Sequence, residues 1–398
     1  MQQIYIHDFH YNLPEERIAK FPASPRDASK LLVYKQGQIC EDTFCHLANH
    51  LPAGALLVFN NTKVIPARLL FHKTSGAAIE IFCLTPCEPV SYEQSLQSET
   101  SCVWHCMVGN LKRWRGEDLL LPFVHNGVHN TLIASKLSEN EQGVQVRFQW
   151  LQGCRFAEAL AACGTMPLPP YLHRAAQPTD YETYQTVYAQ QQGSVAAPTA
   201  GLHFTERVFN SLKINKIQVD NLTLHVGAGT FLPVKTATVN EHSMHAERFV
   251  LRLSLLENLQ KNLGKVYAVG TTSARTLESI YWMGCKLLKY KKLQSIIGQW
   301  EPYEFTPEIS PNEALEALAN YLKTNNLQEI EASTSLIIVP TYRYKIVCGL
   351  LTNFHQPQST LLLLVSALIG NDWQRVYDYA LQHQFRFLSY GDSSLLLP

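Results

Sequence analysis

The stretch Gly193-Ser-Val-Ala-Ala-Pro-Thr-Ala-Gly-Leu-His-Phe-Thr205 organises our interpretation of the chain. It is small and uncharged, and its two glycines and Pro198 predict a shaped turn in which backbone approaches a ligand closely. Thr205 is then the expected N-cap of an amphipathic helix, whose free N–H groups would point at a bound group. His203 lies inside the turn, where a titratable side chain has little structural reason to be. The alternative is a tight buried connection with one hydrogen-bonded histidine.

Length and composition allow a large core and exclude several classes of protein. Of 398 residues 46% are hydrophobic, and 33 basic residues balance 33 acidic ones. We expect two domains, and a nucleic acid would have to bind through a local patch because the net charge is zero. The start has no signal-peptide pattern, and the longest apolar run, Leu361–Ile369, is too short to span a bilayer. Ten irregularly spaced cysteines favour a reduced, cytoplasmic protein without a membrane partner.

The hydrophobic period divides the chain into two kinds of segment. Residues 1–68 and 151–398 mix helical and strand patterns, whereas residues 69–150 alternate in short strands. We therefore predict an α/β fold: a mixed α/β domain built from both ends of the chain, with an inserted all-β, barrel-like domain at 69–150. Within the insertion, Pro86–Ser101 is expected to be a long polar loop.

Polar or glycine-bearing segments directly follow buried-looking strands, as ligand-facing strand ends do. Asn60–Arg68 follows one strand, and Gly227-Ala-Gly229 follows another, which suggests close backbone approach. Several hydroxyl side chains lie at an expected helix start in Gly270-Thr-Thr-Ser-Ala-Arg275. Arg275 in this segment could bind a carboxylate or phosphate through two N–H groups. The alternative for this last segment is redundant N-capping. Other expected strands are Lys30–Tyr34, Leu336–Val339, Leu351–Phe354 and Phe385–Ser389.

Two further segments carry candidate chemistry. His242, His245 and Glu247 could hold a metal, but the spacing is not the helical His-Glu-x-x-His pattern, and polar substrate contacts are favoured. If His245 and Glu247 lie in a strand, they face the same side. Lys112-Arg-Trp-Arg115 is basic with an aromatic inside it, which suits a nucleic-acid contact or, equally, a solvated hairpin tip.

Taken together, these segments resemble the S-adenosylmethionine:tRNA ribosyltransferase-isomerases of queuosine biosynthesis. The resemblance covers nearly the whole chain, and its long segments are highly specific. The matching segments are Tyr11–Pro14, Asn61–Arg68, Leu168–Tyr171, Tyr184–Ala189, Gly193–Thr205, His225–Phe231, Glu241–Glu247, Gly270–Ser279, Leu351–His355, Ser359–Ala367 and Phe385–Asp392.

The resemblance implies an α/β domain carrying an inserted β-barrel, and it implies a reaction. The family transfers and isomerises the ribosyl part of S-adenosylmethionine onto 7-aminomethyl-7-deazaguanine in the tRNA anticodon. The products are epoxyqueuosine in tRNA, adenine and methionine. S-adenosylmethionine is then a substrate, no metal or other cofactor is needed, and we expect a monomer.

The matching motifs assign candidate roles by residue. His203, His245 and Glu247 are the expected acid/base groups, because the reaction needs a base for the methylene next to the sulfonium and an acid for adenine. With Arg275 they are expected to line one pocket. Residues expected to contact tRNA are Lys112, Arg113 and Arg115. Residues expected to bind S-adenosylmethionine are Thr199, Gly201, His225, Gly227, Gly229, Thr271, Thr272, Ser273, Arg275, His355, Tyr390 and Asp392.

The chain departs from the family pattern at three notable positions. The family usually has aspartate where Asn61 stands, glycine where Thr341 stands, and a hydrophobic residue where Gln356 stands. These departures leave open a paralogue that uses S-adenosylmethionine on a different acceptor, or a catalytically silent RNA-binding relative. A methyltransferase is a third hypothesis, although the Gly-x-Gly-x-x-Gly turn expected of that class is missing.

Overall fold

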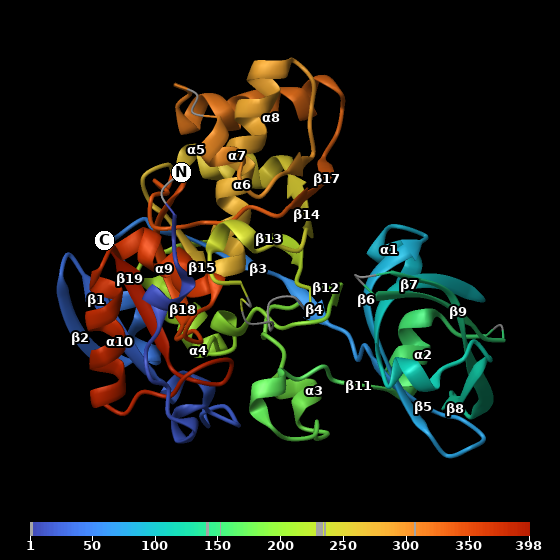
Figure 1. Cartoon of the computed structure of the whole chain (residues 1–398). Coiled ribbons are helices and arrows are strands. Elements are labelled where there is room, and N and C mark those ends of the chain that lie inside the picture. The colour runs from blue at the N-terminus through green and yellow to red at the C-terminus, as the bar shows by residue number, and fades with distance from the viewer. Residues whose placement is uncertain (1–2, 141–142, 152, 228–233, 235, 306–307) are drawn as a thin grey trace.

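A computed structural model describes residues 3–140, 143–151, 153–227, 234, 236–305 and 308–398. Its largest element is a mixed ten-stranded sheet (Figure 1). In spatial order the strands are β16 (Ile296–Ile297), β17 (Glu329–Thr334), β14 (Glu247–Arg252), β13 (Gln218–His225), β3 (Leu56–Asn60), β15 (Val266–Val269), β18 (Val347–Asn353), β19 (Ser393–Leu397), β1 (Lys30–Lys35) and β2 (Gln38–Thr43).

The middle of this sheet, β13-β3-β15-β18, is parallel, and β3, β15 and β18 are buried on both faces. Leu56 and Val58 of β3 join one apolar core, whereas Leu57 and Phe59 join the core on the opposite face. An unbroken apolar run is the expected pattern for such a strand, because both sets of alternating side chains are covered. The fold is therefore α/β, as predicted, with helices on both sides of the sheet.

The helices divide unequally between the two faces of the sheet. The larger core is formed with α5 (Leu253–Lys261), α6 (Thr271–Tyr290), α8 (Pro311–Thr324), α9 (Thr360–Ile369) and α10 (Asp372–Gln382). The smaller core is formed with α4 (Glu206–Ile214), whose N-cap Thr205 accepts a hydrogen bond from the Val208 N–H at 3.4 Å, as predicted. There are also two short helices, α3 (Asp180–Thr183) and α7 (Glu301–Glu304), and Tyr303 of α7 packs against the larger core.

A curled antiparallel sheet of seven strands lies at one end of the molecule (Figure 1). Its own apolar core also contains Phe156 and Leu160 of α2 (Phe156–Cys163), so that core extends beyond the predicted boundary at Trp150. Whether this part is a separate barrel domain stays a prediction. The strands are β11 (Gly164–Thr165), β5 (Arg68–His72), β6 (Ala78–Glu88), β7 (Ser101–Gly109), β10 (Gly143–Gln149), β9 (Val128–Asn140) and β8 (Leu119–His125).

A small parallel pair, β12 (Gln191–Ser194) and β4 (Thr62–Val64), lies where the chain passes between the two large sheets. Thr62 and Ser194 also meet through their side chains, at 2.9 Å between the hydroxyl oxygens. Within the described residues, no helix is long and apolar enough to cross a membrane.

Three predicted elements are wrong. Pro86–Ser101 contains a helix, α1 (Tyr92–Leu96), because Tyr92 and Leu96 are buried in the core of the curled sheet. Leu336–Val339 and Phe385–Ser389 are not strands. The apolar residues of both segments pack in the larger core without the backbone forming a strand ladder. In the second segment Leu388 has a left-handed φ of 68°, which strand geometry excludes.

Candidate functional site

A cavity opens at the carboxyl ends of β15 and β18, between the N-termini of α6 and α9. We call it the strand-end cavity; it spans about 790 Å³ including its open mouth. Ligands of open α/β sheets bind at such strand ends, because loops and helix N-termini converge there. Its polar lining residues are Tyr171, Thr199, Thr271, Thr272, Thr352, Asn353, His355, Gln356, Ser359, Thr360 and Ser389.

The lining contains hydroxyls, amides and one imidazole but no carboxylate, lysine or arginine among the described residues. Two helix N-termini add partial positive charge: Thr271 begins α6, and Ser359 caps α9 by accepting from the Leu362 N–H at 3.3 Å. The predicted contacts Thr199, Thr271 and Thr272 therefore lie together. Such a site suits a polar ligand that carries a carboxylate.

His355 is the imidazole in this cavity, and its backbone is fixed from two sides. Its N–H donates to the Tyr377 hydroxyl at 3.1 Å, and the Tyr11 hydroxyl donates to its carbonyl. Its Nε2 lies 3.0 Å from the Thr352 hydroxyl. Burial lowers the pKa of His355 to about 3, so the ring is neutral at physiological pH.

His203 lies behind the cavity wall, at the inner end of a chain of hydrogen bonds. The Thr199 hydroxyl donates to Asn353 Oδ1 at 2.8 Å, and Asn353 Nδ2 lies 3.3 Å from His203 Nε2. His203 Nδ1 lies 2.8 Å from the Ser29 hydroxyl. Burial lowers the pKa of His203 to about 4. This neutral ring orients Asn353 and, through it, Thr199.

Glu247 and Arg275 form a buried ion pair beside the cavity. Glu247 begins β14, and Arg275 lies one turn into α6 from the cavity-lining Thr271. The Gly227 N–H donates to Glu247 Oε1 at 3.2 Å, next to Val226, which lines the cavity. Burial lowers the pKa of Arg275 to about 10, so it keeps its charge at neutral pH. The pair therefore ties β14, the end of β13 and α6 together.

The four residues predicted to share one pocket thus lie in three places. His203 is behind the strand-end cavity, Glu247 and Arg275 are beside it, and His245 is exposed. None of the four is among the described residues that line it. Their predicted roles in acid/base chemistry and ligand binding stay predictions.

Other residues that were predicted to contact the ligand instead pack against or bind other residues of the protein. A Cβ at Gly201 would lie 1.8 Å from the Tyr188 hydroxyl, so this glycine permits close packing. Ser273 is fully buried in α6. Asp392 accepts from the Lys30 N–H at 3.1 Å and from the Arg386 N–H at 2.8 Å. Gly229 lies outside the described residues.

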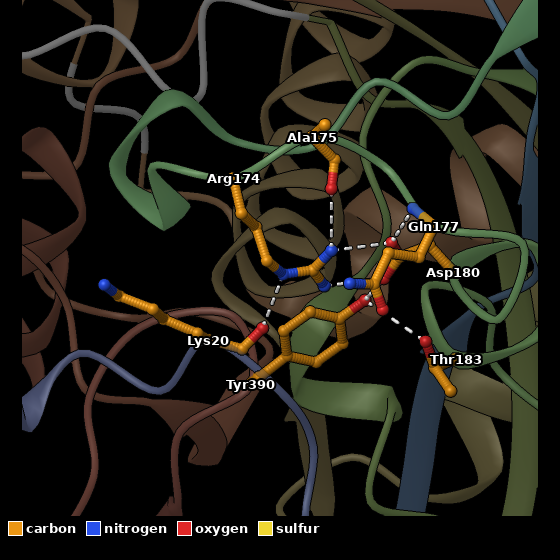
Figure 2. A network of polar contacts seen from close by, with 7 residues as sticks. All are labelled: Lys20, Arg174, Ala175, Gln177, Asp180, Thr183 and Tyr390. Atoms are coloured by element: carbon orange, nitrogen blue, oxygen red, sulfur yellow. Dashed lines mark hydrogen bonds and ion pairs between the residues drawn. The ribbon is translucent and has the colours of Figure 1, made fainter.

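Tyr390 belongs to a polar network that joins α3 to the C-terminal segment (Figure 2). Its hydroxyl donates to Asp180 Oδ1 at 3.0 Å, and Arg174 binds both oxygens of Asp180 at 2.7 Å. Arg174 also donates to the Lys20 carbonyl at 3.0 Å. Tyr390 is 1% exposed, so in this structure it anchors chain segments.

His225 lines a second cavity, between the curled sheet and β12, β13, β14 and β17. We call it the junction cavity; it spans about 940 Å³ including its open mouth. The His225 ring stacks on Tyr92 of α1 with centroids 4.0 Å apart. Burial lowers the pKa of His225 to about 4. His225 lines the junction cavity, and the next residue, Val226, lines the strand-end cavity.

The basic segment of the curled sheet is a turn with exposed charges. Lys112, Arg113 and Arg115 are exposed, as a tRNA contact requires. Trp114, however, is 2% exposed and donates to the Glu117 carbonyl at 2.7 Å, so its ring cannot stack on a base. The aromatic in this motif supports the turn.

Sequence reasoning missed Thr352, Asn353, Ser359 and Thr360 as cavity residues. The sequence did contain a signal for two of them, because Thr352 and Asn353 are polar residues at the carboxyl end of the buried strand β18, like the polar residues that follow β3. Of the departures, Asn61 lines the junction cavity and Gln356 the strand-end cavity. Thr341 has no left-handed φ, so replacing a glycine there costs no backbone strain.

The sequence model of the family described as "Queuosine biosynthesis protein" matches residues 6–396. The chain belongs to this family.

Its relatives carry a more specific name. The S-adenosylmethionine:tRNA ribosyltransferase-isomerases of a Sulfurihydrogenibium species and of Chlorobium chlorochromatii are 35% and 36% identical to it. These matches cover 98% of this chain and 99% and 98% of the relatives. A crystal structure of S-adenosylmethionine tRNA ribosyltransferase from Thermotoga maritima is 27% identical, with a TM-score of 0.46, and the match covers 98% of this chain and 100% of that chain.

Proposed function

We propose that the protein transfers and isomerises the ribosyl part of S-adenosylmethionine onto 7-aminomethyl-7-deazaguanine in a tRNA anticodon. Adenine and methionine leave, and epoxyqueuosine remains in the tRNA. The observation that carries this proposal is the strand-end cavity in a chain of this family, with hydroxyls, two helix N-termini and a neutral His355 around one space.

The residues of this cavity divide the chemical tasks. The N-termini of α6 and α9, with Thr271 and Ser359, hold the methionine carboxylate by backbone N–H groups and hydroxyls. Asn353, oriented by His203, holds Thr199 towards the nucleoside. We assign to His355 the removal of the proton that the sulfonium acidifies on the ribose methylene, because it is the imidazole among the described residues that line the cavity. Departure of adenine then requires a proton at the purine.

The finer partner assignments belong to the same proposal. The substrates are tRNA and S-adenosylmethionine, and the enzyme acts as a cytoplasmic monomer without a metal or other cofactor. The curled sheet is an inserted domain that meets the tRNA through the exposed turn of Lys112, Arg113 and Arg115. Replacing these three by glutamate should weaken tRNA binding at low salt and flatten its salt dependence. Replacing the exposed Lys213 and Lys216, at the C-terminal end of α4, by glutamate is the matched control.

The direct test incubates the protein with S-adenosylmethionine and tRNA that carries 7-aminomethyl-7-deazaguanine, and measures adenine. The proposal predicts one adenine per modified tRNA, and no adenine with tRNA that keeps guanine at that position. Thr271→Val with Thr272→Val should raise the dissociation constant for S-adenosylmethionine, whereas Thr324→Val, at the far end of α8, should not. Absence of adenine with every tRNA, despite bound S-adenosylmethionine, contradicts the proposal.

A further inference from the structure

Few of the side chains that line the strand-end cavity are free to bind a ligand, because most of its polar groups already bond to protein. The Thr199 hydroxyl donates to Asn353 Oδ1 at 2.8 Å, and the Tyr171 and Ser389 hydroxyls lie 2.6 Å apart. Among the described residues of the lining, the polar side chains without a hydrogen bond to protein are the hydroxyls of Thr271, Thr272 and Thr360 and the amide of Gln356.

The three free hydroxyls lie at helix N-termini. Thr271 and Thr272 begin α6, whose N-cap Gly270 has no side chain to cap it, and Thr360 begins α9. The first N–H groups of a helix have no carbonyl partner within the helix, and the macrodipole adds partial positive charge there. These donors suit the carboxylate of an α-amino acid. They do not suit its ammonium group, which is itself a positively charged donor.

Gln356 carries the remaining free group, and its backbone is held beside α9. Its carbonyl accepts from the Ser359 hydroxyl at 2.8 Å, and Ser359 is the N-cap of that helix. The Gln358 N–H donates to the Phe9 carbonyl at 2.9 Å, which also fixes this turn. The Gln356 side chain is half-buried and offers an amide oxygen as an acceptor. A free acceptor therefore comes from the residue whose backbone bonds to the N-cap of α9.

A ligand that carries an α-amino acid needs such an acceptor at this place. Its ammonium group and its carboxylate share one carbon, so the acceptor has to lie beside the donors that hold the carboxylate. The described lining contains no carboxylate, so it offers the ammonium no ion pair. Of the two amides in the lining, Asn353 already accepts from Thr199, whereas Gln356 Oε1 has no donor among the described residues.

We propose that Gln356 determines specificity for the amino-acid part of the ligand. Its Oε1 accepts a hydrogen bond from the α-ammonium group, while the N-termini of α6 and α9 hold the carboxylate. This inference rests on the proposed function, in which the ligand is S-adenosylmethionine. The amino-acid part leaves unchanged in methionine, so this contact is equally strong before and during the reaction and acts on binding rather than on turnover.

The test measures the dissociation constants of the full-length protein for three ligands. They are S-adenosylmethionine, its decarboxylated form, which keeps the amine, and its deaminated form, which keeps the carboxylate. Gln356→Met keeps the length of the side chain and removes the amide. Its affinity for S-adenosylmethionine and for the decarboxylated form should fall about 10- to 100-fold. Its affinity for the deaminated form should stay unchanged, which also shows that the variant is folded.

Two further variants complete the design. Gln356→Glu should bind S-adenosylmethionine more tightly than Gln356→Met does, and the deaminated form more weakly, because its carboxylate attracts an ammonium and repels a carboxylate. The matched control is Gln358→Met, in a half-buried glutamine of the same turn that is not among the described residues of the lining. It should leave all three dissociation constants unchanged.

Three outcomes overturn the inference: unchanged affinity of Gln356→Met for S-adenosylmethionine, an equal loss for the deaminated form, or no recovery in Gln356→Glu. If the unaltered enzyme still releases adenine in that case, the proposed function stands and another group binds the ammonium. If the predicted selectivity is found but the unaltered enzyme releases no adenine with any tRNA, Gln356 has the inferred role in binding and the proposed reaction is wrong.

Discussion

Glu247→Gln separates a structural role of Glu247 from a catalytic one. Glu247 is 5% exposed and Arg275 8% exposed, and they form an ion pair. Burial lowers the pKa of Arg275 to about 10, so the variant would leave a charged guanidinium in the interior without its partner. Removing one member of a buried pair costs about 3–5 kcal/mol. The glutamine oxygen can still accept from Gly227, so this cost comes from the charge.

The assay is urea unfolding at pH 7, together with amide hydrogen exchange in α6 and adenine release. We expect Glu247→Gln to lose about 3–5 kcal/mol, and Glu247→Leu/Arg275→Met to recover most of that loss, because no unpaired charge remains. If Glu247→Gln unfolds like the unaltered protein and loses only turnover, the structural account is wrong and Glu247 is the base. Arg248→Met, a neighbouring half-buried arginine on β14, controls for loss of a guanidinium at the strand.

Three further predictions concern buried titratable groups. His355→Asn should lower adenine release about 10²- to 10⁴-fold with little change in S-adenosylmethionine affinity, and unchanged turnover would refute its assignment as base. Since burial lowers the pKa of His355 to about 3, its protonation should give no step in adenine release between pH 5 and 8. Buried Glu278 accepts hydrogen bonds from the N–H groups of residues 345, 346 and 347 at 2.8, 2.9 and 2.9 Å. In Glu278→Gln an amide nitrogen would face one or more of these donors, so the free energy of unfolding measured in urea should fall by at least about 2 kcal/mol. An unchanged free energy of unfolding would refute this prediction. Finally, burial lowers the pKa values of His203 and His225 from 6.5 to about 4, so below pH 6.5 the unfolded chain binds protons that the folded chain does not. The free energy of unfolding should therefore fall as the pH drops from about 6.5 to 4, by about 3 kcal/mol per histidine. His203→Gln should reduce this dependence on pH, and a pH-independent free energy of unfolding would contradict the prediction.

The sequence allowed the α/β class, the buried strands β1 and β18 and the cap at Thr205 to be predicted, because each has a local pattern. The curled sheet was also predictable from alternation. The tertiary pairings were not. Glu247 and Arg275 come from different elements, and their charges cancel only after folding. The basic segment Lys112–Arg115 has no pattern that predicts burial of the Trp114 side chain, which donates to the Glu117 carbonyl.

The same limit applies to the site. Glycine-bearing turns marked Thr199, Thr271 and Thr272, which do line the strand-end cavity. His203 looked equally reactive from its neighbours, yet Ser29 and Asn353 enclose it. A motif identifies a segment near the site, but tertiary packing decides which of its side chains line the cavity.

The measurement that tests the central claim most directly uses S-adenosylmethionine labelled separately in the ribose and in the methyl group. It is incubated with the protein and tRNA that carries 7-aminomethyl-7-deazaguanine, and both labels are followed into the tRNA. The account predicts that the ribose label enters the tRNA in step with adenine release, while the methyl label leaves with methionine. Methyl label in the tRNA, with the ribose label left on the departing nucleoside, would contradict it.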